Sequence, residues 1–307
     1  MGNAASPAAH LRPHQPRGGY LTARLLLFAP LAIVLGPFLI WPALLGLVTS
    51  FTNYAPGQPA VRVIGLANYI AVIGDREFQA AARNLAVFVL VSVPLELGLG
   101  FLVASLLREP FSGRGLVRVV LLLPWMVSPV ANGVMWHYLG SSTLGLLSFG
   151  PAWLGLPARP SPFALPSLAL PALIAVDVWR KSPLASFLLL PGLLAVPSDQ
   201  WEQATLEGVG VLGRMTQVSL PWLRQLLLPV ALLLAGDALG SFETVLVLTG
   251  GGPGSATVTP ALYSFDKAFT AHAWPVGVTA AWLIVVALAL LGACYLGLLR
   301  RELDAGG

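Results

Sequence analysis

The sequence predicts an all-α membrane protein with six transmembrane helices. Of its 307 residues, 56% are hydrophobic and only 10% are charged, and the mean hydropathy is +0.80. A soluble domain carries about a quarter charged residues, so lipid must solvate most of this protein's exterior. The apolar runs are continuous and do not alternate with polar residues, which favours helices over the strands of a membrane β-barrel.

Each predicted span is long enough to cross the hydrocarbon core, which takes about 20 apolar residues. Several contain prolines, which a bundle tolerates because neighbouring helices can satisfy the freed carbonyls. The six segments are 25–49, 84–107, 115–139, 168–196, 223–248 and 276–299.

Residues 1–24 are polar and Pro-rich, and we expect a disordered cytoplasmic tail ahead of a transmembrane domain over 25–307. The first apolar run is too long for the core of a signal peptide and therefore predicts an uncleaved span. The positive-inside rule favours both termini in the cytoplasm. With that orientation the inner segments hold ten basic residues (Arg12, Arg17, Arg24, Arg108, Arg114, Arg118, Arg214, Arg224, Arg300, Arg301) and the outer loops hold five (Arg62, Arg76, Arg83, Arg159, Lys267).

The longest inner connection, about 197–222, predicts a small docking element. Ser198 is expected to be the N-cap of a short helix, with Asp199 beside its positive end. Glycines that permit a turn follow the helix, and Leu220-Pro221 marks the entry to the next span. Such a structured loop is too short to be a domain and suits the binding of a partner.

At this loop the sequence resembles the inner-membrane components of ABC importers. Their signature is Glu-Ala-Ala, three residues, Gly, nine residues, and Ile-x-Leu-Pro. Here it stands as Glu202-Gln203-Ala204, Gly208 and Val218-Ser219-Leu220-Pro221, with the spacing kept and with Gln203 and Val218 as departures. The resemblance implies that the loop forms coupling helices that contact a cytoplasmic ATPase through Glu202, Gln203, Ala204, Gly208, Leu220 and Pro221.

Further motifs narrow the resemblance to sugar importers of the maltose, glycerol-3-phosphate and multiple-sugar type. Leu248-Thr249-Gly250-Gly251-Gly252-Pro253 is similar to the signature of the larger of their two permeases. Matches also occur at Gly65–Tyr69 with Phe78 and Asn84, and at Trp179, Pro183, Gly192-Leu193 and Pro197. The resemblance implies that the Gly250, Gly251, Gly252 and Pro253 loop shapes the outer mouth; a simple tight outer turn is the alternative.

What the resemblance implies is a multi-pass subunit of a bacterial inner membrane. Its partners would be a second related permease, two ATPase subunits and an extracytoplasmic sugar-binding protein. The sequence has no Gly-x-x-x-x-Gly-Lys-Ser/Thr motif, so we expect no cofactor in this chain and no enzyme activity, with ATP and Mg bound by the ATPase. One cysteine and four scattered histidines predict no metal site, and the net charge of +4 suits anionic lipid rather than nucleic acid.

The resemblance places sugar contacts at Asp177, Lys181 and Leu184 in the fourth span and at Asp237, Ala238 and Ser241 in the fifth. The residues themselves point the same way. The first three share one helix face, as do Asp237 and Ser241. Facing lipid, a charged group within a span would cost at least about 2.5–3.5 kcal/mol, which favours a cavity or a partner.

Other roles for the charged residues stay open at this point. Asp177 and Lys181 could simply pair along their helix, and Arg180 is expected to point elsewhere and extend to the interface. Glu96 is expected to be structural. Glu243 could line an outer gate or contact the second permease.

The predicted function is a permease subunit of an ATP-driven sugar importer, with a disaccharide such as maltose or trehalose as substrate. Glycerol-3-phosphate or another small solute is the alternative, although a phosphate would prefer a positive cavity and Asp177 and Asp237 outnumber Lys181. Weaker alternatives are a proton-coupled secondary transporter and an intramembrane enzyme using the two aspartates as an acid pair.

Overall fold

The computed structural model describes residues 28, 30–31, 33–55, 57, 60–142, 145–146 and 160–305. The predicted tail over 1–24 lies outside the described residues. The chain divides into two units, one ending at Val48 and one beginning at Thr49. In the first, a π-helical turn η1 (Gly36–Ile40) leads into α2 (Trp41–Ser50), whose last two residues belong to the second unit.

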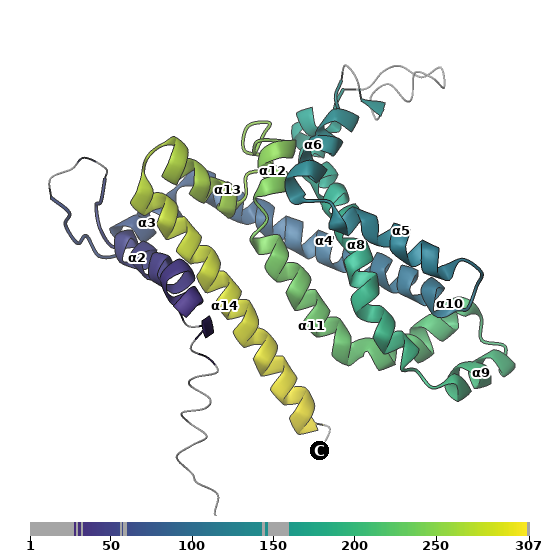
Figure 1. Ribbon diagram of the computed structural model, residues 1–307. Coiled ribbons are helices and arrows are strands. Elements are labelled where there is room, and N and C mark those ends of the chain that lie inside the picture. Colours follow the sequence, from purple (N-terminus) through teal and green to yellow (C-terminus); the bar gives the residue numbers. More distant parts are fainter. Residues whose placement is uncertain are drawn as a thin grey trace, which may run out of the picture. The chain divides into compact units, whose positions relative to one another are not determined.

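The regular secondary structure of the second unit is helical in its described residues, and an isolated bridge joins Thr52 to Val63 in a loop (Figure 1). A π-helical turn joins α10 to α11, and another follows α13. The helices are α3 (Ala67–Gly74), α4 (Arg76–Arg108), α5 (Arg114–Met126), α6 (Pro129–Leu139), α8 (Pro166–Leu194), α9 (Ser198–Leu206), α10 (Val211–Arg214), α11 (Leu220–Leu239), α12 (Glu243–Leu248), α13 (Pro260–Phe265) and α14 (Trp274–Ala305), with the turns η2 (Pro162–Ala164), η3 (Met215–Ser219) and η4 (Asp266–Thr270).

Length and composition identify fewer than six spans among the described residues. Four helical segments are long and apolar enough: Ile33–Ser50, Arg76–Arg108, Met215–Leu239 and Trp274–Gly297. The bent pair α5 and α6 makes a fifth if it is one span. Helix α8 has 29 residues, enough to cross, but carries three charged side chains close together in its middle.

The prediction of one continuous helix over 115–139 is wrong. Helices α5 and α6 meet at an angle of 91°. Extended residues Val127 and Ser128 separate them, and the Ser128 hydroxyl accepts a hydrogen bond from the backbone N–H of Ala131. Pro129 then occupies the first position of α6, where a missing N–H costs nothing. The sequence therefore ends one helix and caps the next.

The prediction of one continuous helix over 223–248 is also wrong. Helix α11 ends at Leu239 with Gly240 as its C-cap, and the separate helix α12 begins at Glu243. Ser241 therefore lies beyond the helix that carries Asp237, and the two do not share a helix face. The turn is held because the Thr259 hydroxyl donates to the Ser241 carbonyl at 3.3 Å.

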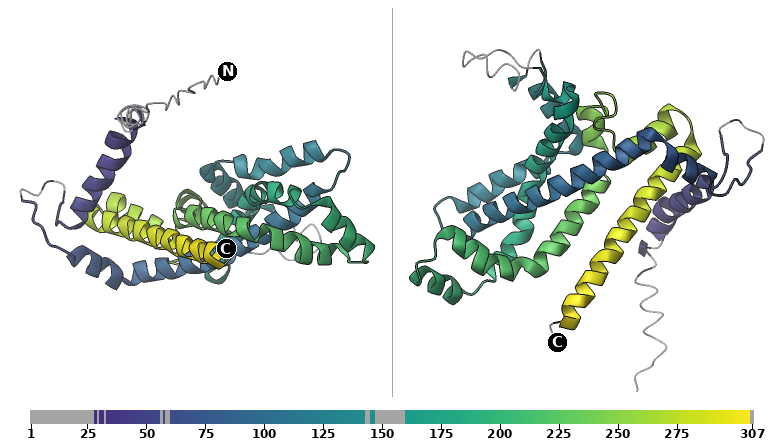
Figure 2. Two further views of the ribbon diagram at one scale, coloured as in Figure 1. Left: turned by 90° about the horizontal axis from the view of Figure 1, so that it is seen from below. Right: turned by 180° about the vertical axis from the view of Figure 1, so that it is seen from behind.

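The largest apolar core lies where α4, α8 and α11 pack together, and the views of Figures 1 and 2 agree on their proximity. Gly100 on α4 permits this approach: a Cβ there would lie 2.6 Å from the Cβ of Ala185 on α8. Leucines and small residues fill the remaining space, among them Ala104, Leu107, Leu189, Leu193, Leu223 and Leu234. The same packing brings the charged middle of α8 against α11.

A polar cluster joins the start of α4 to α13 and η4. Asp75 caps α4 by accepting from the Glu77 backbone N–H at 2.9 Å, and the Tyr263 hydroxyl donates to Asp75 at 2.7 Å. Lys267 lies 2.9 Å from the Glu77 carboxylate and 3.6 Å from that of Asp75. Burial raises the pKa of Asp75, but the hydrogen bonds from Tyr263 and Glu77 together with the Lys267 charge hold it below its ordinary value of 3.8.

We expect Tyr263→Phe to reduce the stability of the protein and to flatten its acid dependence. The lost hydrogen bond to a charged group is worth about 1.5–3 kcal/mol. Because the pKa of Asp75 is lowered in the folded protein, its contribution is present above 3.8 and is lost as the pH falls through the folded pKa. Thermal midpoints of both proteins in detergent, from neutral pH downwards, test this. Parallel curves would contradict it.

Candidate functional site

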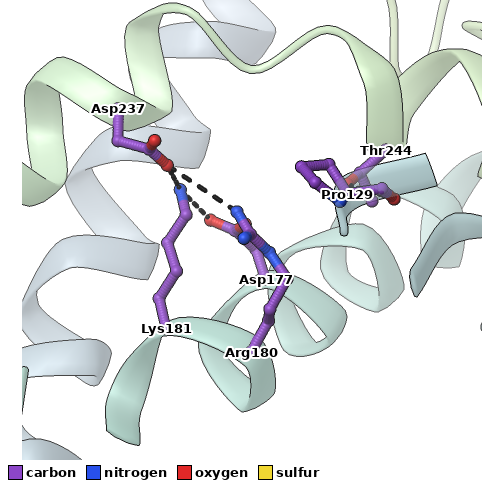
Figure 3. A network of polar contacts seen from close by, with 6 residues as sticks. All are labelled: Pro129, Asp177, Arg180, Lys181, Asp237 and Thr244. Carbon is purple, nitrogen blue, oxygen red and sulfur yellow. Dashed lines mark hydrogen bonds and ion pairs between the residues drawn. The ribbon is translucent and has the colours of Figure 1, made fainter. Parts of the chain in front are cut away.

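Four charged side chains from α8 and α11 form one ion-pair cluster (Figure 3). The Lys181 ammonium lies 2.9 Å from Asp177 Oδ2 and 2.6 Å from Asp237 Oδ2. The Arg180 guanidinium lies 3.8 Å from Asp177 Oδ1 and 3.7 Å from Asp237 Oδ2. Both cations therefore bridge the same two carboxylates, and the cluster ties α8 to α11.

The members of this cluster differ greatly in exposure. The side chains of Lys181 and Asp177 are each 2% exposed, whereas that of Asp237 is 58% exposed. Both ion pairs of Asp237 go to Oδ2, and in Figure 3 its other carboxylate oxygen points away from the two cations. The cluster thus presents one fixed carboxylate that can accept hydrogen bonds from a ligand.

The structure brings together three of the six predicted pathway residues. The pairing of Asp177 with Lys181 is confirmed. Leu184 packs against the apolar core, Ala238 is fully buried, and Ser241 lies beyond α11. The prediction that Arg180 points elsewhere is wrong, because both of its ion pairs lie inside the cluster. The i, i+3 spacing of Arg180 from Asp177 was the signal for it.

Glu96 of α4 lies against the same cluster. It is fully buried, and neither of its carboxylate oxygens has a hydrogen-bond partner among the described residues. Asp177 and Lys181 are the charged groups that act most strongly on it, so α4 brings a third carboxyl group, itself buried, to this cluster.

The short helix predicted in the 197–222 loop is present as α9, which begins at Ser198. Pro197, not Ser198, is its N-cap, and no side chain caps the helix, so that detail of the prediction is wrong; the Ser198 hydroxyl bonds to Asp199 instead. At the other end Gly208 has φ +78°, and its N–H donates to Thr205. The next N–H, of Val209, donates to Ala204 at 2.9 Å. This pair of bonds is a Schellman motif, which needs a left-handed residue at the glycine.

Within the loop, the predicted contact residues fall into two groups. Glu202, Gln203, Leu220 and Pro221 are exposed, whereas Ala204 is buried. The Trp201 ring holds α9 in place through cation–π contacts: the guanidinium groups of Arg108 and Arg214 lie 4.1 and 5.1 Å from the ring centroid. The loop therefore exposes both polar and apolar predicted contact residues, and its helix α9 is held at Trp201.

The conformation of the Gly250–Gly254 loop is fixed by close packing and by hydrogen bonds. Gly250, Gly251 and Gly254 have positive φ, and a Cβ on Gly251 would approach Val258 and Leu262 to within 3 Å. The Thr257 hydroxyl donates to the Gly252 carbonyl at 2.9 Å. The side-chain amide of Asn84 on α4 donates to the carbonyls of Ser255 and Val258. The sequence analysis identified Asn84 as part of a family motif, but it did not predict these two hydrogen bonds to the loop.

A family comparison connects these features to transport. The family of binding-protein-dependent transport system inner membrane components matches residues 96–303, a range that holds the ion-pair cluster, α9 and the glycine loop. The chain belongs to this family. It is accordingly a helical membrane protein of a transport system, and we refer to it as the permease.

Several curated relatives of the permease are named as sugar transport permeases. The trehalose/maltose transport system permease protein MalF of Thermococcus litoralis is 34% identical over 78% of this chain and 81% of the relative. The trehalose transport system permease protein SugA of Mycobacterium tuberculosis is 28% identical over 92% and 90%. The sn-glycerol-3-phosphate permease UgpA of Agrobacterium fabrum is 26% identical over 80% and 83%.

A solved structure shares the fold of the permease. It is a chain of a bacterial alginate ABC transporter, crystallised with an alginate pentasaccharide-bound periplasmic protein. The TM-score is 0.78 at 20% identity, with 93% of this chain and 96% of that chain covered. At this identity the likeness concerns the fold alone.

We expect Lys181→Met to destabilise the permease by about 3–5 kcal/mol, because it removes the nearest cation from the buried carboxylate of Asp177 and leaves only the longer contact with Arg180. The double variant Asp177→Leu/Lys181→Met should recover most of this loss. Arg180→Gln, which breaks only the longer contacts, should cost less. Thermal unfolding in detergent measures all three. Equal losses in the single and double variants would contradict the role of the pair.

We expect Gly208→Ala to loosen the end of α9. A Cβ there meets no atom within 4 Å, so the cost is conformational, about 1–2 kcal/mol for a left-handed alanine. The matched control is Gly210→Ala, which also meets no atom and has no positive φ. Hydrogen exchange at the Val209 amide should rise about tenfold in Gly208→Ala alone. Equal exchange in the two variants would contradict the Schellman assignment.

Proposed function

We propose that the permease is the translocating subunit of an ATP-driven sugar importer and that the ion-pair cluster meets the sugar through Asp237. The observation that carries this proposal is the contrast within the cluster: Asp237 is 58% exposed while its Lys181 partner is buried. A carboxylate held by two cations keeps a fixed position, and its free oxygen can accept from sugar hydroxyls.

The charge balance of the cluster favours a neutral sugar. Asp177 and Asp237 are matched by Lys181 and Arg180, so no cation is left over for a phosphate or an acidic sugar. Together with relatives named for trehalose and maltose, this supports a disaccharide over glycerol-3-phosphate.

The proposed assembly pairs this permease with a second related permease, two ATPase subunits and an extracytoplasmic sugar-binding protein. In it, six segments cross the inner membrane with both termini cytoplasmic, counting α5 with α6 as one bent span and α8 as another. Because α8 carries the charged cluster, it would line the pathway between the two permeases. The exposed Glu202 on α9 would seat in the ATPase.

Reconstituted permeases with their ATPase, tested with the sugar-loaded binding protein across a sugar panel, provide the test. We expect disaccharide-dependent ATP hydrolysis and uptake, with uptake lowered about tenfold by Asp237→Asn, which weakens hydrogen bonds to a charged acceptor. Glu109→Gln, an exposed carboxylate on the α4–α5 turn, is the control and should transport normally. Stimulation by glycerol-3-phosphate alone would overturn the substrate class.

The Glu202→Lys variant tests the coupling part of the proposal. It should insert in the membrane and assemble with the second permease, yet lose sugar-stimulated hydrolysis, because a cation replaces an exposed carboxylate on α9. Uptake that continues in this variant, or that proceeds without any ATPase, would instead indicate a proton-coupled secondary transporter.

A further inference from the structure

Four arginines outside the ion-pair cluster gather around the C-terminal end of α4. Arg114 donates to the Arg108 carbonyl at 3.2 Å, and Arg118 donates to the Leu107 carbonyl at 3.3 Å. Arg108 itself donates to the Val196 carbonyl at 3.4 Å. Arg214 joins them because it shares the Trp201 ring with Arg108.

None of these four cations forms an ion pair in the described part of the chain, where the ion pairs all involve Arg180, Lys181 or Lys267. The charge of Glu109, just beyond the end of α4, acts on Arg108 without forming an ion pair. Their hydrogen bonds to carbonyls also leave some of the guanidinium N–H donors unused. Arg108 Nη1, Arg118 Nε and Arg214 Nε are buried nitrogens without a hydrogen-bond partner among the described residues. Buried donors of this kind are costly unless an acceptor completes them.

An apolar groove of about 600 Å³ is lined by one of these arginines, Arg214, and by the Trp201 ring that Arg108 contacts. Its walls come from the end of α4, from α5 and from the segment after α9, and Trp201 and Arg214 lie on its lining. The apolar residues include Leu106, Phe111, Val117, Leu121 and Val211.

We infer that this groove binds an anionic phospholipid, with the phosphate on the arginines and an acyl chain along the groove. Phosphate oxygens are strong acceptors that match several guanidinium donors at once. Basic pockets between membrane helices on the cytoplasmic side suit such head groups. The inference rests on the proposed function only in placing this end of α4 at the cytoplasmic surface.

Two occupants could bind these arginines, an anionic lipid or an acidic protein surface, and the apolar groove favours the lipid. A protein docking on the arginines would need no chain-sized apolar cavity beside them. Helix α5, which lines the groove with Val117 and Leu121, also carries exposed apolar residues: Leu116 is 71% exposed, and Val119, Val120 and Leu123 are exposed as well. This surface suits the hydrocarbon region of a bilayer. The lipid head group would therefore meet the arginines, and its acyl chain would meet apolar side chains.

A lipid in this site would act on the coupling loop. Arg108 and Arg214 contact the Trp201 ring, and Trp201 belongs to α9. A phosphate that holds both guanidinium groups therefore also holds the base of α9. Anionic lipid thereby becomes part of the support for the docking helix.

Native mass spectrometry of the assembled transporter, purified from membranes that contain phosphatidylglycerol, tests the inference. We expect lipid to be retained by the wild type and its affinity to fall about fivefold for each of Arg118→Gln and Arg214→Gln. Val117→Trp, which fills the groove and keeps every arginine, should also lower retention. Arg224→Gln removes an exposed arginine outside the groove and should retain lipid normally.

Three results would overturn the inference. Retention could be the same in the wild type and all the variants, or phosphatidylcholine could be retained as well as phosphatidylglycerol. Alternatively, Arg214→Gln could release the ATPase subunit with lipid unchanged, which would assign the arginines to an acidic protein surface. Failure of the proposed function is distinct, because it would appear as hydrolysis that no sugar stimulates while lipid retention stays intact.

Discussion

The buried ammonium of Lys181 is the interaction on which the arrangement of α8 and α11 depends. A cation this deeply buried is tolerated only where its carboxylate partners are close, and Asp177 and Asp237 lie within 3 Å of it. One partner is on its own helix and one is on the next span, so the charge requirement also fixes how the two helices face each other. Asp237 is thereby held at the exposed edge of an otherwise buried cluster.

Close backbone approach makes that arrangement possible. Gly100 lets α4 lie against Ala185, which carries α4 far enough toward α8 for Glu96 to reach the cluster. At the other end of α4, the same helix supplies Arg108 to the Trp201 ring. A single long helix therefore contributes to both the charged cluster and the base of α9.

Residues that end or begin helices explain why two of the predicted continuous spans are broken in the structure. The hydrophobic pattern runs unbroken over 115–139 and 223–248, because hydropathy does not register where a helix ends. Ser128 with Pro129 restarts one helix, and Gly240 stops another. Both signals were present in the sequence. In a membrane segment, however, prolines and glycines are common inside helices, so their position alone did not decide between a kink and a break.

The sequence by itself determined that lipid surrounds the protein, that it is helical, that the 197–222 loop contains a short helix, and to which family the chain belongs, because these follow from composition and from motifs at fixed spacing. It also identified Asp177 and Lys181 as a pair, since i, i+4 neighbours meet on any helix. Only the tertiary structure decided that Arg180 turns into the cluster, that Ser241 leaves the face of Asp237, and that Arg108 and Arg214 share one ring. Each of these depends on how separate helices pack or on where a helix ends, and spacing along one helix carries no information about either.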